Sequence, residues 1–177
     1  MRPILLSLLL ATGLHAAPQW IWLSKDGNKD NKVTFRHRFE VPQNAQLATL
    51  ELTCDNGAVA SLNGKKVLTN ADWQEAVKVD VTKDIKLGES NEIIVNATNK
   101  GGTAALVARL TLKMPDGRPN AVIETSGKWD ATTTGKEEWK PALVINEYGK
   151  GPWGLALDGK AGGGKKSGPA ETIAANE

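Results

Sequence analysis

The sequence predicts an all-β fold, a sandwich or barrel of antiparallel strands. Polar and apolar side chains alternate in several short segments, which is the pattern of strands with one buried face. Turn-forming clusters of Gly, Asn, Asp and Pro separate these segments, and no segment has the period of an amphipathic helix. Without helical crossovers the strands are expected to pair antiparallel.

The clearest alternation starts at Val33 and ends before Pro42, after an apolar segment at residues 20–23 and a polar loop at 25–32. Asn63-Gly64 predicts a tight hairpin, because both residues tolerate the positive φ of a type I′ turn. Further strands are predicted at residues 48–54, 58–62, 77–82, 92–97, 104–113 and 121–125.

Two residues with reactive side chains are predicted to be structural. Cys54, the single cysteine, alternates with polar neighbours, so we interpret it as a small buried residue rather than a reactive thiol. His37 lies between Phe35 and Phe39 in the alternating pattern, which favours a partly buried, structural role over a role as a general base.

The N-terminus has the pattern of a secretory signal peptide. Arg2 supplies a positive charge, an apolar run follows, and Ala16 and Ala17 offer small residues for cleavage. Residues 1–16 are therefore predicted to be removed, and the mature chain to be periplasmic or extracellular. Residues 17–157 are predicted as the β-sandwich domain, and 158–177, rich in Gly and Lys at first, as a disordered tail or linker.

Charge and composition exclude several classes of partner. The chain has 22 basic and 20 acidic residues and no basic stripe, so nucleic acid is not an expected partner. No later stretch approaches about 20 consecutive apolar residues, so no membrane span is expected.

Catalysis is not expected. His37 is the only histidine after the predicted cleavage site, and the sequence contains no nucleophile elbow or zinc-protease motif. The glycines at 162–164 precede Lys165 in an order that imitates a phosphate loop, but they do not connect a strand to a helix. We therefore assign no catalytic residues.

The order of short motifs along the chain resembles a known module, the galactose-binding-like jelly-roll domain beside the catalytic domain of bacterial α-L-rhamnosidases. A similar module precedes large secreted dehydrogenase-like and haem-binding bacterial proteins. The likeness covers residues 20–154. It rests on Trp20-Ile21-Trp22, Phe35 to Phe39, Thr53 to Asn56, Leu62 to Val67, Trp73, Val79 to Thr82, Leu87 to Asn91, Ala97 to Gly102, Trp129, Trp139 to Ala142 and Tyr148 to Gly154. The resemblance implies an eight-stranded jelly roll with sugar contacts at loop ends, and no catalysis.

Sugar binding requires an aromatic face together with amides or carboxylates for the hydroxyls. Trp73 is the predicted platform, since it stands among polar residues in a segment without strand character, beside Asp72. Asp55, Asn56 and Asn99 lie at predicted strand ends and are the expected polar contacts. Two alternatives stay open. Trp73 can be a plug that covers the end of the sandwich, and Asp55-Asn56 can be residues that simply form a turn.

No cofactor or catalytic metal is expected. A structural calcium ion is the open alternative, because residues 26–30 form an oxygen-rich loop, although Lys25 and Lys29 flank its carboxylates and the EF-hand pattern is absent.

Two functions follow from these observations. One is a secreted, non-catalytic carbohydrate-binding module whose partner is a polysaccharide or glycan. The other is a structural or interaction module that packs against a separate catalytic or redox domain, the chain being an N-terminal fragment or a stand-alone copy.

Overall fold

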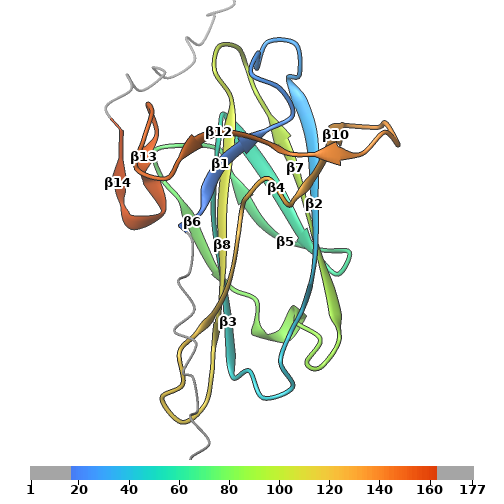
Figure 1. The fold of residues 1–177 in the computed structure, drawn as a ribbon, viewed down its shortest axis with the longest axis vertical. Helices are drawn as coiled ribbons and strands as arrows, with labels where there is room; N and C mark the ends of the chain where they lie inside the picture. The colour runs from blue at the N-terminus through green and yellow to red at the C-terminus, as the bar shows by residue number, and fades with distance from the viewer. Residues whose placement is uncertain (1–16, 163–177) are drawn as a thin grey trace, which may run out of the picture.

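The computed structural model describes residues 17–162. They form two six-stranded antiparallel sheets packed face to face, with a small hairpin at one side (Figure 1). The all-β prediction is confirmed, with two six-stranded sheets in place of the eight strands that the resemblance implied. The predicted signal peptide and residues 163–177 of the predicted tail lie outside the described residues.

The first sheet has the strand order β12–β1–β8–β3–β6, and β9 also pairs with β8. Its longest ladder joins β3 to β8, from Leu47 opposite Lys113 to Asp55 opposite Ala105. The strands of this sheet are β1 (Gln19–Trp22), β3 (Leu47–Asp55), β6 (Val77–Asp80), β8 (Ala105–Lys113), β9 (Ala121–Glu124) and β12 (Leu143–Glu147).

The second sheet has the order β11–β10–β2–β7–β4–β5. Its longest ladder pairs β2 with β7, from Lys32 opposite Thr98 to Glu40 opposite Ser90. The strands of this sheet are β2 (Lys32–Glu40), β4 (Gly57–Leu62), β5 (Lys65–Asn70), β7 (Ser90–Thr98), β10 (Asp130–Thr133) and β11 (Lys140–Pro141).

The remaining elements are short. A 3-10 turn, η1 (Thr82–Asp84), follows β6. A second, η2 (Ala156–Asp158), lies between β13 (Gly154–Leu155) and β14 (Lys160–Ala161), which pair with each other. The folded elements thus continue past residue 157, where the sequence placed the end of the domain.

The alternating residues fill the space between the two sheets. Val33 and Phe35 are fully buried, as are Leu52 and Cys54 on the facing sheet. Burial raises the pKa of the Cys54 thiol, which keeps it protonated and unreactive. The prediction that Cys54 is a core residue is confirmed.

His37 is packed between rings rather than placed in an open site. It stacks on Trp129 with ring centroids 5.2 Å apart and an interplanar angle of 7°, and on Phe39 at 6.3 Å. Burial lowers its pKa despite the nearby carboxylate of Asp130. Its structural role agrees with the sequence pattern.

The Asn63-Gly64 hairpin between β4 and β5 forms as predicted. Both residues have positive φ, 51° and 83°, and Leu62 pairs with Lys65 across the turn. The Asn63 carboxamide also donates to the backbone oxygen of Asp84 at 2.7 Å. The turn is therefore fixed both by its own backbone and by a contact with η1.

A second apolar cluster lies on the outer side of the first sheet. Ala105 and Val107, which alternate with core residues of β8, point away from the sandwich and pack under Trp20 and Trp153. The two indoles have ring centroids 5.1 Å apart. We call the covering segment, residues 148–161 with β13, η2 and β14, the C-terminal cap.

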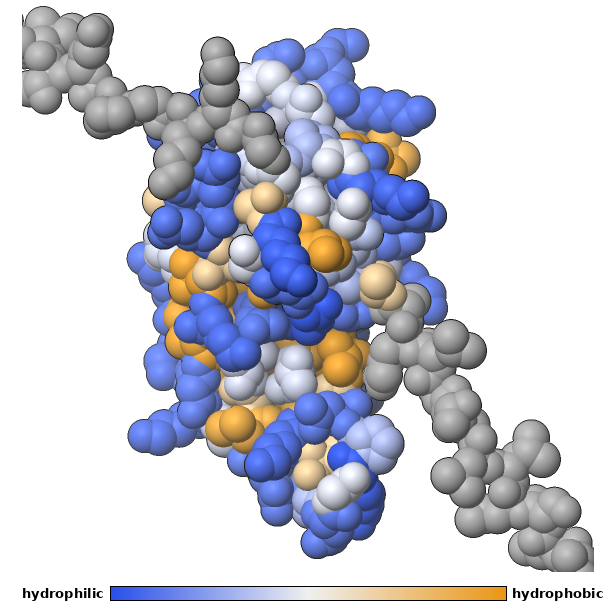
Figure 2. Space-filling model, turned by 90° about the vertical axis from the view of Figure 1, so that its left-hand side faces the viewer, coloured by the Kyte–Doolittle hydropathy of each residue, from blue (hydrophilic) through white to orange (hydrophobic). Residues whose placement is uncertain are grey.

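Figure 2 shows the side of the molecule on which the cap lies in Figure 1. Its hydrophobic residues form separate patches among hydrophilic ones. Scattered patches of this kind are usual on protein surfaces and do not by themselves indicate an interface. Within residues 17–162, the structure contains no helix long and apolar enough to cross a membrane.

Candidate functional site

Four connecting segments meet at one end of the sandwich, which we call the loop end. The antiparallel registers require this: Asp55 ends β3 opposite Ala105, and Lys32 starts β2 opposite Thr98. The segments are residues 23–31, residue 56, residues 71–76 and residues 99–104. All five candidate residues from the sequence therefore lie at or beside this end.

Asp55 is held by a tryptophan from the C-terminal cap. The indole Nε1 of Trp153 donates a hydrogen bond of 2.9 Å to Oδ2 of Asp55, 98 residues away in sequence. Burial raises the pKa of Asp55, and the hydrogen bond from Trp153 partly offsets that effect. A half-buried carboxylate oriented in this way is well suited to accept hydrogen bonds from hydroxyl groups.

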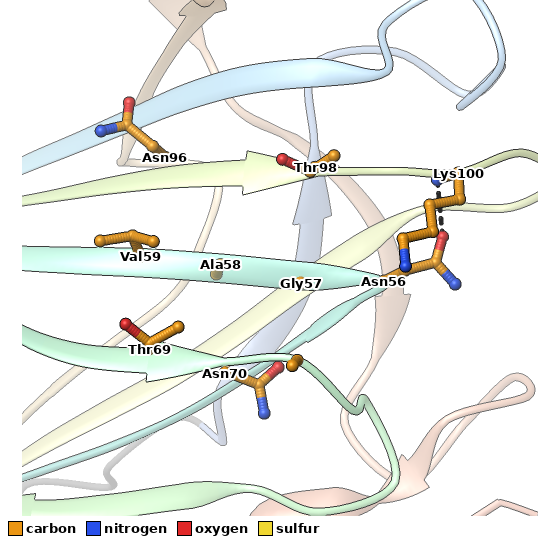
Figure 3. Close-up of a pocket in the computed structure, with 10 residues that line it drawn as sticks. Asn56, Gly57, Ala58, Val59, Thr69, Asn70, Asn96, Thr98 and Lys100 are labelled. Carbon is orange, nitrogen blue, oxygen red and sulfur yellow. Dashed lines mark hydrogen bonds between the residues drawn. The ribbon is translucent and has the colours of Figure 1, made fainter. Parts of the chain in front are cut away.

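Asn56 connects the β3–β4 turn to the β7–β8 loop. Its backbone N–H donates to the Thr98 oxygen at 2.8 Å, and its Oδ1 accepts from the backbone N–H of Lys100 at 2.7 Å. In Figure 3 the Lys100 side chain folds back beside Asn56, and the amide nitrogen of Asn56 points away from the Lys100 backbone. An amide nitrogen in this position can donate a further hydrogen bond.

Asp72 and Trp73 lie in the β5–β6 segment. Oδ1 of Asp72 accepts the Gln74 backbone N–H at 2.9 Å, and the hydroxyl of Thr53 donates to the backbone oxygen of Trp73 at 2.9 Å. The half-buried Trp73 ring packs against the cluster around Trp153. The ring therefore covers part of that cluster, in line with the alternative that Trp73 is a plug over the end of the sandwich. It is also partly open to solvent.

The Asn99 side chain forms hydrogen bonds with the backbone of two loops. It is 4% exposed; its Nδ2 donates to the oxygens of Gly27 and Gly102, and its Oδ1 accepts from Gly101. Gly27 is close enough that a Cβ there would come within 2.9 Å of the Asn99 amide nitrogen. Asn99 thus shapes the loop end, whereas the sequence predicted a direct ligand contact.

A shallow hollow of about 220 Å³ opens next to Asn56, on the outer face of the second sheet (Figure 3). Its walls come from the ends of β4, β5 and β7, and its base includes Val59 and the small residue Gly57. None of the described residues that line it carries a carboxylate. The polar residues lining it are Asn56, Thr69, Asn70, Asn96, Thr98 and Lys100.

Sequence reasoning missed Trp153 and Lys100 as parts of this region. Trp153 stands in a Gly- and Pro-rich segment far along the chain, and Lys100 is one of many lysines. Only the folded chain brings Trp153 to Asp55 and Lys100 to Asn56. The motif order around residues 148–154 was the one indication that this segment completes the module.

The loop predicted as an alternative calcium site is held by its own residues. The Asp30 carboxylate accepts from the Ser24 hydroxyl, and Oδ1 of Asp26 accepts the Asn28 backbone N–H at 3.1 Å. Across residues 17–162, no group of three or more His, Cys, Asp or Glu side chains is arranged to hold a metal ion.

Comparison with curated proteins gives one bacterial relative. No family model matches the chain. An α-L-rhamnosidase from Streptomyces avermitilis is 26% identical over 156 residues, which cover 76% of this chain and 15% of that enzyme. The chain thus spans about one seventh of the curated relative that it matches.

The solved structures agree with this match. The S. avermitilis α-L-rhamnosidase complexed with L-rhamnose superposes with a TM-score of 0.70 at 24% identity, over 77% of this chain and 15% of the enzyme. A lectin from the fungus Pleurotus ostreatus in complex with GalNAc has a TM-score of 0.65 at 25% identity, over 79% of this chain and 45% of the lectin. In sequence and in fold, the chain matches a β-sandwich module of α-L-rhamnosidases.

Proposed function

We propose that this chain is a secreted, non-catalytic carbohydrate-binding module, and that the loop end binds the sugar. Trp73 supplies an aromatic face, Asp55 and Asn56 supply hydrogen bonds to hydroxyl groups, and Asp72 contributes a further carboxylate. Trp153 positions Asp55, and Asn99 holds the neighbouring loops in place. The observation that carries the proposal is the convergence of Asp55, Asn56 and Trp73 from two separate connections at one end of the sandwich.

The chemistry of these groups suits a sugar better than a reaction. A pyranose offers an apolar face for stacking and hydroxyls for planar acceptors and amides. Cys54 is fully buried in the core, and the half-buried His37 is stacked on Trp129, so neither side chain is presented as a reactive group beside the Asp55 carboxylate. The lectin fold match supports the same interpretation, since that protein was solved with GalNAc bound.

Glycan binding by residues 17–177 tests the proposal, with L-rhamnose- and GalNAc-terminated glycans included in the panel. Asp55→Asn should lose about tenfold or more in affinity, because a hydrogen bond to a charged acceptor contributes about 1.5–3 kcal/mol. Trp73→Ala should lose binding as well. Asp116→Asn, on the β8–β9 turn at the opposite end of the sandwich, is the matched control.

The thermal midpoint separates loss of binding from loss of fold. Asp55→Asn keeps an oxygen that can accept from Trp153, so its fold should be retained. Unchanged affinity in both Asp55→Asn and Trp73→Ala would contradict a sugar site at the loop end.

The alternative, an interaction module that packs on a separate catalytic or redox domain, is favoured by one observation. Leu47 and Leu87 are 40% and 42% exposed at the end opposite the loops, where they line an apolar hollow of about 90 Å³ with Ile85. Exposed leucines around a hollow suit a protein contact. A chain that binds no glycan on the panel would support this alternative.

A further inference from the structure

We propose that the outer face of the second sheet binds an anionic glycan chain, with one sugar residue in the hollow beside Asn56. The acidic groups of the chain would pair with Lys32, Lys66 and Lys100. This inference rests on the proposed sugar-binding function and extends it from the loop end to the sheet face, and from any glycan to one carrying carboxylate or sulfate groups.

The strand registers align a row of short side chains across this face. Thr34, Asn96, Val59 and Thr69 are in register across β2, β7, β4 and β5. Side chains in register point to the same side of a sheet, and three strand spacings of about 4.8 Å span about 14 Å. The row therefore forms a strip longer than a single sugar ring, with the hollow at its β4–β5 end.

The strip carries groups that pair with sugar hydroxyls. Thr34 donates from Oγ1 to Oδ1 of Asn96 at 2.8 Å and lies 3.0 Å from Oγ1 of Thr134, and these contacts are exposed to solvent. In Figure 3 Asn96, Thr98 and Thr69 flank the half-buried Val59 on the ribbon of this sheet. Amides and hydroxyls around a small apolar patch match the mixed surface of a pyranose.

The neighbouring rows add positive charge. Lys32 is in register with Thr98, and Lys66 with Ser61, so both flank the strip, while Lys100 lines the hollow. Lys32, Lys66 and Lys100 are exposed, and none takes part in an ion pair within residues 17–162.

Two carboxylates near the strip are already paired. Asp130 is bound to Arg36 at 2.9 Å, and Glu92, four positions before Asn96 on β7, is bound to Arg38 at 2.7 Å. The strip is therefore flanked by three unpaired cations, and an anionic ligand complements it whereas a neutral one leaves these charges unused.

The strip and the loop end are continuous. Asn56 lines the hollow and also stands next to Asp55 in the β3–β4 turn. A chain whose end occupies the loop end can thus continue over Asn56 into the hollow and along the strip. Lys100 folds back beside Asn56, at the junction of the two regions (Figure 3).

Affinity electrophoresis and calorimetry of residues 17–177 with three polymers test the inference: polygalacturonic acid, dextran sulfate and neutral dextran. At low salt the wild-type protein should bind at least one of the acidic polymers and not dextran. The two acidic arms distinguish carboxylate from sulfate as the recognised group. Binding should weaken as salt is raised, because exposed charge pairs are screened.

The triple variant Lys32→Gln, Lys66→Gln, Lys100→Gln should bind the acidic polymer about tenfold more weakly, since three exposed ion pairs, each weak by itself, are lost together. The matched control is Lys83→Gln, Lys113→Gln, Lys128→Gln, which removes the same charge from exposed lysines outside the strip. An equal loss in both variants, or equal binding of acidic and neutral polymers, would overturn the inference.

The outcome is separable from that of the proposed function. Neutral glycans bound at the loop end and lost in Asp55→Asn would uphold the sugar-binding function even if the strip binds nothing. Acidic binding lost in the lysine variant but kept in Asp55→Asn would uphold the strip alone.

Discussion

At the scale of single residues, the pair formed by Asp55 and Trp153 is the most informative contact. The indole and the carboxylate are 2.9 Å apart and join the candidate sugar site to the C-terminal cap. Desolvation raises the pKa of Asp55, so the folded state favours its protonated form. This carboxylate therefore contributes stability below its ordinary pKa of 3.8, and that contribution is lost as the pH rises through its raised value in the fold.

Asp55→Asn should remove that dependence. We expect the thermal midpoint of the variant to match the wild type below pH 3.8 and to exceed it increasingly as the pH rises through the raised pKa. The difference should stay within roughly 2–4 °C, the change that about 1 kcal/mol makes in a domain of this size, because solvent screens a half-exposed carboxylate. Differential scanning fluorimetry across pH measures it, and a constant difference would contradict the assignment.

At the scale of elements, Arg109 of β8 ties the first sheet to the C-terminal cap. Its guanidinium bonds Glu124 of β9 at 2.8 Å and Asp158 of η2 at 3.3 Å, and lies over the Tyr148 ring at 5.8 Å. The pKa of Tyr148 is raised to about 12 by burial and by the Asp158 carboxylate. The cap is thus held by polar contacts as well as by the tryptophan cluster beneath it.

Arg109→Met should lower the free energy of unfolding by about 1.5–3 kcal/mol, because it leaves the mostly buried Glu124 carboxylate without its partner. Lys78→Met breaks the pair with Glu51, in which the lysine side chain is 66% exposed, and should cost less than about 1 kcal/mol. Urea unfolding of both variants gives the comparison. Equal losses would contradict the larger contribution assigned to the Arg109–Glu124 pair.

At the scale of the whole molecule, the described chain is a single sandwich with the candidate sugar site at one end and exposed leucines at the other. Under the proposed function, a glycan bound at the loop end would leave the far end to face another part of an assembly. The S. avermitilis relative, of which the chain covers 15%, contains a matching module within a much longer enzyme.

Secretion is the prediction that belongs to this scale. Expressed from Met1 in a bacterial host, the protein should be exported and cleaved after Ala16, because Pro18 disfavours cleavage one residue later. Mass spectrometry of the periplasmic fraction should then find Ala17 at the N-terminus. A cytoplasmic product that keeps residues 1–16 would contradict the predicted signal peptide.

The sequence by itself determined the class of fold and the local features. Alternation over residues 33–40 predicts a strand that buries Val33 and Phe35, and Asn63-Gly64 forms the expected hairpin, because side-chain period and turn chemistry depend on near neighbours. The burial of Cys54 followed from the same alternation. Motif order also placed Asp55, Asn56 and Trp73 in one module.

Only the tertiary structure decided what those residues contact. Trp153 hydrogen-bonds Asp55 although the two residues are 98 positions apart in the chain. The amide nitrogen of Asn99 donates to backbone carbonyl oxygens of the loops, and residues of three strands line the hollow. These outcomes depend on strand order and register, which are set by packing between distant segments and leave no local pattern in the chain. For the same reason the row of Thr34, Asn96, Val59 and Thr69 became visible only once the sheet was paired.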